Sequence, residues 1–338
     1  MSDTKPKILL LGNIDHSDSE SARLTVVSAH KDWESLSSLG ELVKAESKDR
    51  ESFIKDCKDG KYDGVVAAYR TFNSISMTGR FDEELVNALP KSWKYLSHNG
   101  AGYDQIDPEP CSKRDPPLFV SNVPTAVDDA TADTAIFLML GALRNYNPAI
   151  KALRQGHDPQ GKVLGVLGMG GIGRNMSKKA AAFGMTTIYH NRRKLDDEKA
   201  GGAKYVSFED LLKQSDVLSL NLPLSPKTKH IIGVEQLKMM KKSAIVVNTA
   251  RGAVIDEAAL VEALENSTIA GAGLDVFEEE PKIHPGLVKN ENVFLLPHMG
   301  TWTQETQYKM ERWVIDNVKS ALEKGKLMSV IPEQESLQ

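Results

Sequence analysis

The stretch "VLGVLGMGGIG", residues 163–173, decides the fold of this chain. Its aliphatic start is typical of a buried strand, the pattern Gly168-x-Gly170-x-x-Gly173 follows at once, and a helical pattern comes next. In such a unit the first glycine permits a tight turn, the second lets the backbone approach a pyrophosphate, and the third allows close helix–strand packing. The N–H groups at the helix N-terminus favour phosphates. The stretch therefore predicts a dinucleotide site, and a glycine-rich turn without a ligand is the alternative.

Basic residues follow the next predicted strand, residues 187–189. Sites for NAD usually carry an aspartate or glutamate at this point, which accepts hydrogen bonds from the ribose hydroxyls. This chain has Asn191, Arg192 and Arg193 instead, and its first carboxylate beyond them is that of Asp196. Guanidinium groups match the charge and geometry of a 2′-phosphate, so NADPH/NADP⁺ is the expected cofactor and NADH remains possible. A solvated basic surface turn is the alternative.

Short apolar runs alternate with helical patterns almost to the end of the chain, which predicts an α/β fold with parallel sheets. The predicted strands are residues 8–11, 62–69, 94–97 and 118–121 in a first series, and 163–168, 187–189, 217–220, 244–248, 271–274 and 293–296 in a second. The predicted helices include residues 50–58, 82–89, 127–144, 171–183, 208–213, 234–240, 257–265 and 304–324. We expect a nucleotide-binding domain, residues 122–303, inserted into a first domain of residues 1–121 and 304–338.

Bulk properties narrow the function classes. With 338 residues, two domains are expected, and the net charge of −4 gives no reason to expect nucleic acid as a partner. The longest apolar run, residues 135–143, is far shorter than the roughly 20 residues that span a bilayer. No secretory signal is evident, and Cys57 and Cys111 have no partner motif, so we expect free thiols, no membrane association and a cytoplasmic location. No metal-ligand spacing is present, so no metal is expected.

Three polar residues lie near strand ends of the second series, where open α/β sheets bind their ligands. They are Arg251 in "NTARG", Glu280 in "FEEEP" and His298 in "PHMG". Reduction of a 2-oxo acid needs a cation that holds the carboxylate and polarises the carbonyl, and an acid that protonates the oxygen. Arg251 suits the first role, and His298 suits the second because histidine changes charge near neutral pH. A carboxylate such as Glu280 beside the histidine would favour the charged ring and fix its orientation.

Several motifs in this order resemble those of the D-isomer-specific 2-hydroxyacid dehydrogenases, and among them the fungal-type glyoxylate and hydroxypyruvate reductases. The resemblance covers nearly the whole chain and rests on "HNGAGYDQID" (98–107), "NVP" (122–124) with Ala132-Asp133, the glycine pattern 168–173, "NTARG" (248–252), "GLDVF" (273–277) with Glu280-Pro281, and "PHMG" (297–300). It implies two flavodoxin- or Rossmann-like domains, with parallel sheets flanked by helices and the active site in the interdomain cleft. It also implies a homodimer, with the hinge and the start of the dimer-forming region in residues 122–143.

The same resemblance assigns roles to individual residues. The family's catalytic residues fall on Arg251, Glu280 and His298, and Asp275 is expected to meet the nicotinamide carboxamide. Backbone N–H groups of Asn99, Gly100 and Ala101, together with Arg251, would bind the substrate carboxylate. The other expected cofactor-binding residues are Gly168, Gly170, Gly171, Ile172, Gly173, Asn191, Arg192, Arg193, Asn221, Pro223, Thr249 and Ala250.

The resemblance leaves the substrate open. The leading interpretation is NADPH-dependent reduction of glyoxylate and hydroxypyruvate to the D-2-hydroxy acid. The alternative is a bulkier substrate, as in D-mandelate-type dehydrogenases, with Trp302 and residues 70–73 either shaping the pocket or serving only as packing and turn residues. A phosphoglycerate dehydrogenase and a nucleotide-sensing corepressor fit less well. Residues 145–161 form a shorter stretch than the arm that usually precedes the cofactor-binding strand, which bears on the dimer contact.

Overall fold

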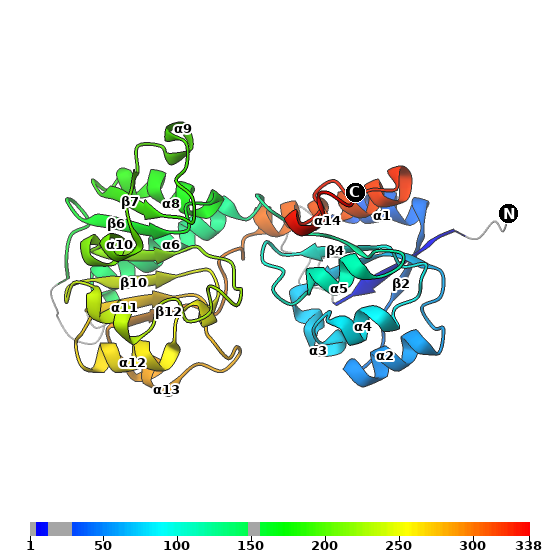
Figure 1. The fold of residues 1–338 in the computed structure, drawn as a ribbon, viewed down its shortest axis with the longest axis horizontal. Coiled ribbons are helices and arrows are strands. Elements are labelled where there is room, and N and C mark those ends of the chain that lie inside the picture. Colours follow the sequence, from blue (N-terminus) through cyan, green and yellow to red (C-terminus); the bar gives the residue numbers. More distant parts are fainter. Residues whose placement is uncertain (1–4, 13–28, 148–155) are drawn as a thin grey trace. The chain divides into compact units, whose positions relative to one another are not determined.

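The computed structural model describes residues 5–12, 29–147 and 156–338. The chain divides into two compact units, Met1–Val127 with Thr303–Gln338 (unit 1) and Asp128–Trp302 (unit 2), each a parallel sheet flanked by helices (Figure 1). The predicted fold class is confirmed. The expected domains, residues 1–121 with 304–338 and residues 122–303, have borders close to those of the two units, and Asn122 and Val123 hydrogen-bond to Ala101 and Gly100 of unit 1. Residues 148–155 of the predicted arm lie outside the described residues.

Unit 1 is built on a five-stranded parallel sheet with the order β2-β1-β3-β4-β5. Its strands are β1 (Lys7–Leu11), β2 (Glu41–Lys44), β3 (Val65–Thr71), β4 (Tyr95–Asn99) and β5 (Phe119–Ser121). Its helices are α1 (His30–Leu39), α2 (Arg50–Lys58), α3 (Ile75–Thr78), α4 (Glu83–Ala88), α5 (Pro108–Lys113) and α14 (Gln304–Lys324), with the short helices η2 (Phe72–Ser74) and η4 (Pro332–Gln334). The last long helix, α14, packs beside β3 and β4, so the end of the chain completes unit 1.

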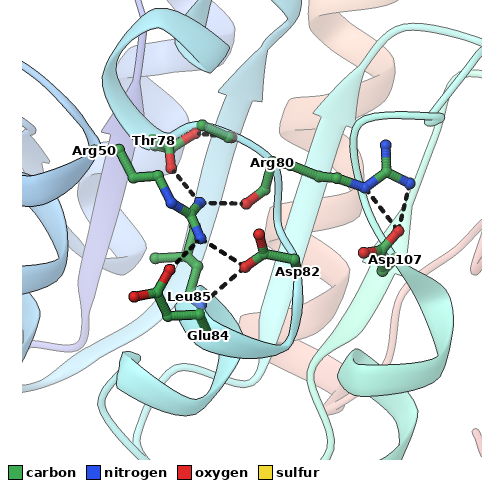
Figure 2. A network of polar contacts seen from close by, with 8 residues as sticks. Arg50, Thr78, Arg80, Asp82, Glu84, Leu85 and Asp107 are labelled. Carbon is green, nitrogen blue, oxygen red and sulfur yellow. Dashed lines mark hydrogen bonds and ion pairs between the residues drawn. The ribbon is translucent and has the colours of Figure 1, made fainter.

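A network of charged residues fixes the loop between α3 and α4 in unit 1 (Figure 2). Arg50 of α2 donates to the carbonyls of Thr78 and Arg80, at 3.1 and 2.7 Å, and pairs with Asp82, which also caps α4. Arg80 in turn donates to the carbonyl of Asp104 at 2.6 Å and pairs with the carboxylate of Asp107. The loop is thereby tied to residues 104–107, which follow the segment expected to bind substrate.

Unit 2 is built on a seven-stranded parallel sheet with the order β12-β11-β10-β9-β6-β7-β8. The strands are β6 (Val163–Leu167), β7 (Thr186–His190), β8 (Lys204–Tyr205), β9 (Val217–Leu220), β10 (Ile245–Asn248), β11 (Gly271–Leu274) and β12 (Val293–Leu295). The helices are α6 (Asp128–Leu143), α8 (Gly171–Ala181), α9 (Asp197–Ala200), α10 (Phe208–Gln214), α11 (Val234–Met239), α12 (Glu257–Glu265), α13 (Pro285–Lys289) and the short η3 (Gly252–Val254). The central strands β9 and β10 are buried along their whole length, as parallel strands covered on both faces are.

The strand order of unit 2 reverses at β6, which lies between β7 and β9. Ligands of open α/β sheets bind outside the carboxyl ends of the strands at such a switch point. The glycine turn lies at this end of β6.

Elsewhere in the fold, Cys57 and Cys111 are buried free thiols, and burial raises the pKa of each to about 12. Within the described ranges, the structure has no helix that is long and apolar enough to cross a membrane.

Candidate active site

The glycine turn of unit 2 is held by close backbone packing. Gly168 has a φ of +98°, and a Cβ on it would lie 2.6 Å from the carbonyl oxygen of Asn221. A Cβ on Gly173 would lie 2.6 Å from the carbonyl oxygen of Gly168. Both positions require glycine because of the protein itself, the first for its positive φ and the second for lack of space.

Gly170 differs from both, since a Cβ there would meet no protein atom within 4 Å, and its φ of −82° suits any residue. Glycine at this position leaves space for a ligand rather than for another part of the protein. Helix α8 begins directly after it, and no side chain caps the N–H groups of its first turn. Uncapped N–H groups beside open space are the environment that a pyrophosphate needs.

Two buried polar atoms lie on the residues that follow the neighbouring strands. Asn221, after β9, donates to Ser219, but among the described residues its own Oδ1 has no hydrogen-bond donor, and neither has Oγ1 of Thr249, after β10. Buried polar atoms are normally hydrogen-bonded, so these two fit a polar ligand at this edge of the sheet. Together with Gly170 they fit a nicotinamide dinucleotide. The other expected cofactor-binding residues lie nearby in the sequence, with Ile172 in the first turn of α8, Pro223 after β9 and Ala250 after Thr249.

The basic turn after β7 contains Asn191, which is hydrogen-bonded to the glycine turn, and the exposed residues Arg192 and Arg193. Asn191 Oδ1 accepts a hydrogen bond from the N–H of Met169 at 2.6 Å, which ties this turn to the glycine turn. Arg192 and Arg193 are exposed. In the part of the chain that the structure describes, neither guanidinium has a carboxylate within ion-pair distance. Both charges are thus available to an anion.

The turn that carries Arg251 is fixed by the side chain of Asn248. Asn248 Nδ2 donates to the carbonyl of Arg251 at 2.9 Å, and its Oδ1 accepts from the N–H of Ala250 at 3.0 Å. A Cβ on Gly252 would lie 1.9 Å from the carbonyl carbon of Phe277, so this turn packs directly against the backbone that leads to Glu280. The contact brings the Arg251 charge close enough to favour the ionised carboxylate of Glu280.

Glu280 and His298 form the centre of the candidate site. His298 Nδ1 lies 2.7 Å from Glu280 Oε2, and Glu280 Oε1 accepts from the N–H of Phe277 at 2.9 Å. Because an ionised carboxylate only accepts, Nδ1 carries a hydrogen, and Nε2 is the ring nitrogen left for chemistry. Burial raises the pKa of Glu280, but hydrogen bonds from His298 and Phe277, with the charges of His298 and Arg251, bring it below its ordinary value. Glu280 is therefore ionised at neutral pH.

Asp275 holds the loop that carries His298. Its two carboxylate oxygens accept from the N–H groups of Met299 and Gly300, at 2.7 and 2.8 Å. Asp275 is almost fully buried, and burial raises its pKa even though the two N–H groups oppose the shift. His298 itself has a φ of +54°, which is uncommon for a residue other than glycine. The clamp from Asp275 stabilises this conformation, and a contact with a nicotinamide carboxamide remains a prediction.

In unit 1, the segment after β4 has three successive carbonyls tied to the protein. The donors are Val123 N–H to Gly100 O at 3.0 Å, Asn122 Nδ2 to Ala101 O at 2.8 Å, and His98 Nε2 to Gly102 O at 3.0 Å. The C=O and N–H of a trans peptide point in opposite directions. The N–H groups of Ala101 and Gly102 therefore point away from these donors, as in a backbone site for an anion.

The two other residues expected to bind the carboxylate have different surroundings. The N–H of Gly100 donates to the carbonyl of His98 at 3.1 Å, so it is already engaged. Asn99 ends β4, its Nδ2 donates to the Tyr69 hydroxyl at 2.8 Å, and its buried Oδ1 has no hydrogen bond. Of the three amides predicted from the sequence, that of Ala101 fits the role best.

The structure thus brings Arg251, Glu280 and His298 to the carboxyl ends of the strands in unit 2. Residues 99–101 lie at the carboxyl end of β4 in the separate sheet of unit 1. Sequence reasoning missed the supporting residues Asn248 and Gly252. Both lie inside the quoted motif "NTARG", so the signal was present but was interpreted only for Arg251.

Comparison with known proteins identifies the family. Residues 136–300 match the family model described as "D-isomer specific 2-hydroxyacid dehydrogenase, NAD binding domain". The chain is 51% identical to 4-methyl-2-oxopentanoate reductase A of Aspergillus oryzae, over 98% of this chain and 99% of that protein. Among solved structures, a glyoxylate reductase from Paecilomyes thermophila is 51% identical, with a TM-score of 0.91 and coverage of 98% and 99%. The D-mandelate dehydrogenase of Rhodotorula graminis is 27% identical, with a TM-score of 0.88 and coverage of 97% and 98%. The chain therefore belongs to the D-isomer specific 2-hydroxyacid dehydrogenase family and is an NAD(P)-dependent oxidoreductase.

Proposed function

We propose that this enzyme reduces small 2-oxo acids, glyoxylate and hydroxypyruvate first among them, to D-2-hydroxy acids with NADPH. The observation that carries the proposal is the 2.7 Å contact between His298 and Glu280, beside Arg251 and on the sheet that bears the glycine turn. A histidine oriented by an ionised carboxylate is a proton donor for a developing alkoxide. The similarity to a glyoxylate reductase over nearly the whole chain supports the small substrate.

The residues divide the chemistry as follows. A nicotinamide bound at the glycine turn would supply the hydride for C2 of the 2-oxo acid, with the electron pair of the C=O bond passing to the oxygen. His298 gives the proton on Nε2 to that oxygen, and Glu280 holds the ring by Nδ1 and stabilises its positive charge. Arg251 polarises the carbonyl and binds the carboxylate through its guanidinium fork. The balance is 2-oxo acid, NADPH and one proton to 2-hydroxy acid and NADP⁺.

The backbone N–H groups of Ala101 and Gly102 are the proposed donors to the substrate carboxylate on unit 1. Their direction, set by the tied carbonyls of Gly100 and Ala101 in the same peptides, supports this role. For the cofactor, the exposed guanidinium groups of Arg192 and Arg193 support a 2′-phosphate and hence NADPH over NADH.

A bulkier 2-oxo acid is the second candidate. It is favoured by the 51% identity to a protein named for 4-methyl-2-oxopentanoate, a branched substrate, and by the fold likeness to a D-mandelate dehydrogenase. Trp302, with 68% of its surface exposed, lies four residues after His298 and remains a candidate for shaping the pocket. Arg70 does not, because it is fully buried and bonded to His98 and Gln105.

The test is a matrix of kcat/KM values for glyoxylate, hydroxypyruvate, 4-methyl-2-oxopentanoate and phenylglyoxylate, each with NADPH and NADH. We expect glyoxylate with NADPH to give the highest value. A preference for one of the two bulkier acids would replace the substrate assignment and keep the chemistry.

The double variant Arg192→Asp, Arg193→Ala should lower the NADPH/NADH preference about tenfold or more, because it loses two guanidinium contacts to the phosphate. An unchanged preference would contradict the role of the basic turn.

The homodimer is also proposed. Phe137 of α6 is half-exposed and packs edge-on against Phe294, with ring centroids 5.3 Å apart, which supports an interface on this face. Light scattering after size exclusion should give twice the chain mass of 37.1 kDa, and a monomer mass would contradict the proposal. A cytoplasmic location remains a prediction.

A further inference from the structure

Arg70 and His98 form a buried polar pair beneath the segment of residues 99–102. They lie on the neighbouring strands β3 and β4, directly opposite one another in the ladder, and neither is exposed to solvent. Arg70 Nη1 lies 2.9 Å from His98 Nδ1, and Arg70 Nη2 donates to Gln105 Oε1 at 2.6 Å. The pair is thus part of the core of unit 1, and it belongs to none of the proposed catalytic roles.

The partners of His98 decide its protonation. Its Nε2 lies 3.0 Å from the carbonyl oxygen of Gly102, which can only accept, so Nε2 carries a hydrogen. Its Nδ1 faces a guanidinium group, which can only donate, so Nδ1 carries none. His98 is therefore neutral and relays a hydrogen bond from Arg70 to the Gly102 peptide.

The guanidinium of Arg70 supplies a positive charge below the same segment. Both of its hydrogen bonds go to neutral groups, and it lies over the ring of Phe81 with a guanidinium-to-centroid distance of 5.5 Å. Burial lowers the pKa of Arg70 to about 10, against the opposing effect of the Asp104 charge, so the side chain is charged at neutral pH. A buried cation is costly, and the retention of this one with no bonded carboxylate among the described residues calls for a role.

We propose that Arg70 and His98 are positioning residues for substrate binding: the chain Arg70–His98–Gly102 holds the backbone of residues 100–102 so that the N–H groups of Ala101 and Gly102 meet the substrate carboxylate. This inference rests on the proposed function. The ring of His98 supports the segment directly, because a Cβ on Gly100 would lie 2.8 Å from its Nε2. Loss of the Gly102 contact frees the carbonyl of that residue, so the Gly102 backbone can rotate and its own N–H loses a fixed direction toward the anion.

Two variants of one residue separate the two halves of the relay. A glutamine amide reaches the position of a histidine Nε2, so His98→Gln keeps a donor to Gly102. An asparagine amide reaches the position of Nδ1, so His98→Asn keeps an acceptor for Arg70 and loses the bond to Gly102. We expect His98→Asn to raise KM for glyoxylate about three- to tenfold, the worth of one hydrogen bond, with KM for NADPH and kcat near wild type. His98→Gln should stay within about twofold of wild type.

The Kd of oxalate, measured by calorimetry with NADPH present, gives a readout without turnover and should rise in His98→Asn by the same factor as KM. Equal effects of both variants on KM and Kd, at equal loss of Tm, would show a merely structural role and overturn the inference. Wild-type values in His98→Asn would overturn it as well. If wild-type protein binds NADPH but reduces no 2-oxo acid, the proposed function fails, and the oxalate Kd still decides the inference.

Discussion

Two histidines in this molecule lie at the carboxyl ends of parallel strands and differ in what faces Nδ1. His98, in unit 1, is fully buried and faces the guanidinium of Arg70 at 2.9 Å. His298, in unit 2, has a side chain that is 35% exposed and faces the carboxylate of Glu280 at 2.7 Å. In the first ring Nδ1 accepts from the cation and carries no hydrogen, whereas in the second ring Nδ1 donates to the carboxylate. The same residue type is thus held in opposite ways, which matches the positioning role proposed for His98 and the proton transfer proposed for His298.

The largest expected effect tests the role proposed for His298 as the proton donor. His298→Gln removes the proton donor and should lower kcat about 10²- to 10⁴-fold, because that is the usual worth of a general acid. Steady-state kinetics at saturating NADPH measures it, and the Kd of NADPH should not change. The matched control is His98→Gln, which is expected to keep kcat near wild type. Similar losses in both variants would remove the distinction between the two histidines.

The next largest effect concerns the buried guanidinium of Arg70, which faces His98 in unit 1. Arg70→Met leaves two buried acceptors, His98 Nδ1 and Gln105 Oε1, without their donor, and each costs about 1–3 kcal/mol. The expected loss in the free energy of unfolding is therefore about 2–6 kcal/mol, measured by chemical denaturation. Lys113→Met is the control, since both side chains of its ion pair with Glu109 are exposed and the loss of that pair should change stability little. A loss no larger than that of the control would contradict a structural role for Arg70.

A smaller effect concerns the carboxylate behind His298. In the proposed mechanism Glu280 holds the ring of His298 by Nδ1, at 2.7 Å. Glu280→Gln keeps the size of the side chain and removes its charge, and should lower kcat about tenfold, the worth of a hydrogen bond to a charged group. The control is Glu278→Gln, which removes a carboxylate on the same loop that lies 2.6 Å from His230 instead. A kcat in Glu280→Gln that equals that of the control would show that Glu280 does not act on His298.

The smallest effect is on stability. The pKa of Glu280 is below its ordinary value in the folded protein, so its stabilising contribution is present above the unfolded-state value near 4.5. This contribution is lost as the pH falls through the lower, folded-state value. At pH 7, Glu280→Gln should lower Tm by about 1–3 °C, and the gap should shrink at pH 3.5. A gap that widens at acid pH would contradict the direction of the shift.

How far the sequence predicts this structure depends on burial. Parallel strands covered on both faces are continuous apolar runs, so β9 and β10 were predicted within a residue or two, and the ends of α12 and α14 were placed as observed. The edge strand β2, "ELVK", is short and only partly buried, and β8 has two residues. Neither has the pattern that marks a strand, and both were missed.

The site shows the same limit. Motifs predict roles for Arg251, Glu280 and His298 because the chemistry restricts which residue types can serve, and these roles remain predictions. Motifs were not enough for Arg70, which was considered as a pocket residue and is buried instead. Its partner His98 is 28 residues away and meets it only through the register of β3 and β4. Contacts that depend on the pairing of distant segments are not encoded in a local pattern.

The empty surroundings of Gly170 have a consequence for the history of such a chain. At Gly168 and Gly173 the protein's own backbone excludes other residues, so selection for folding alone maintains glycine there. At Gly170 no atom of residues 5–12, 29–147 or 156–338 does so, and a side chain there would instead meet a bound partner. A descendant that kept the fold but abandoned its cofactor would be free to drift at this position while its two neighbours stayed unchanged. The identity of this single residue thus records whether a lineage still uses the site.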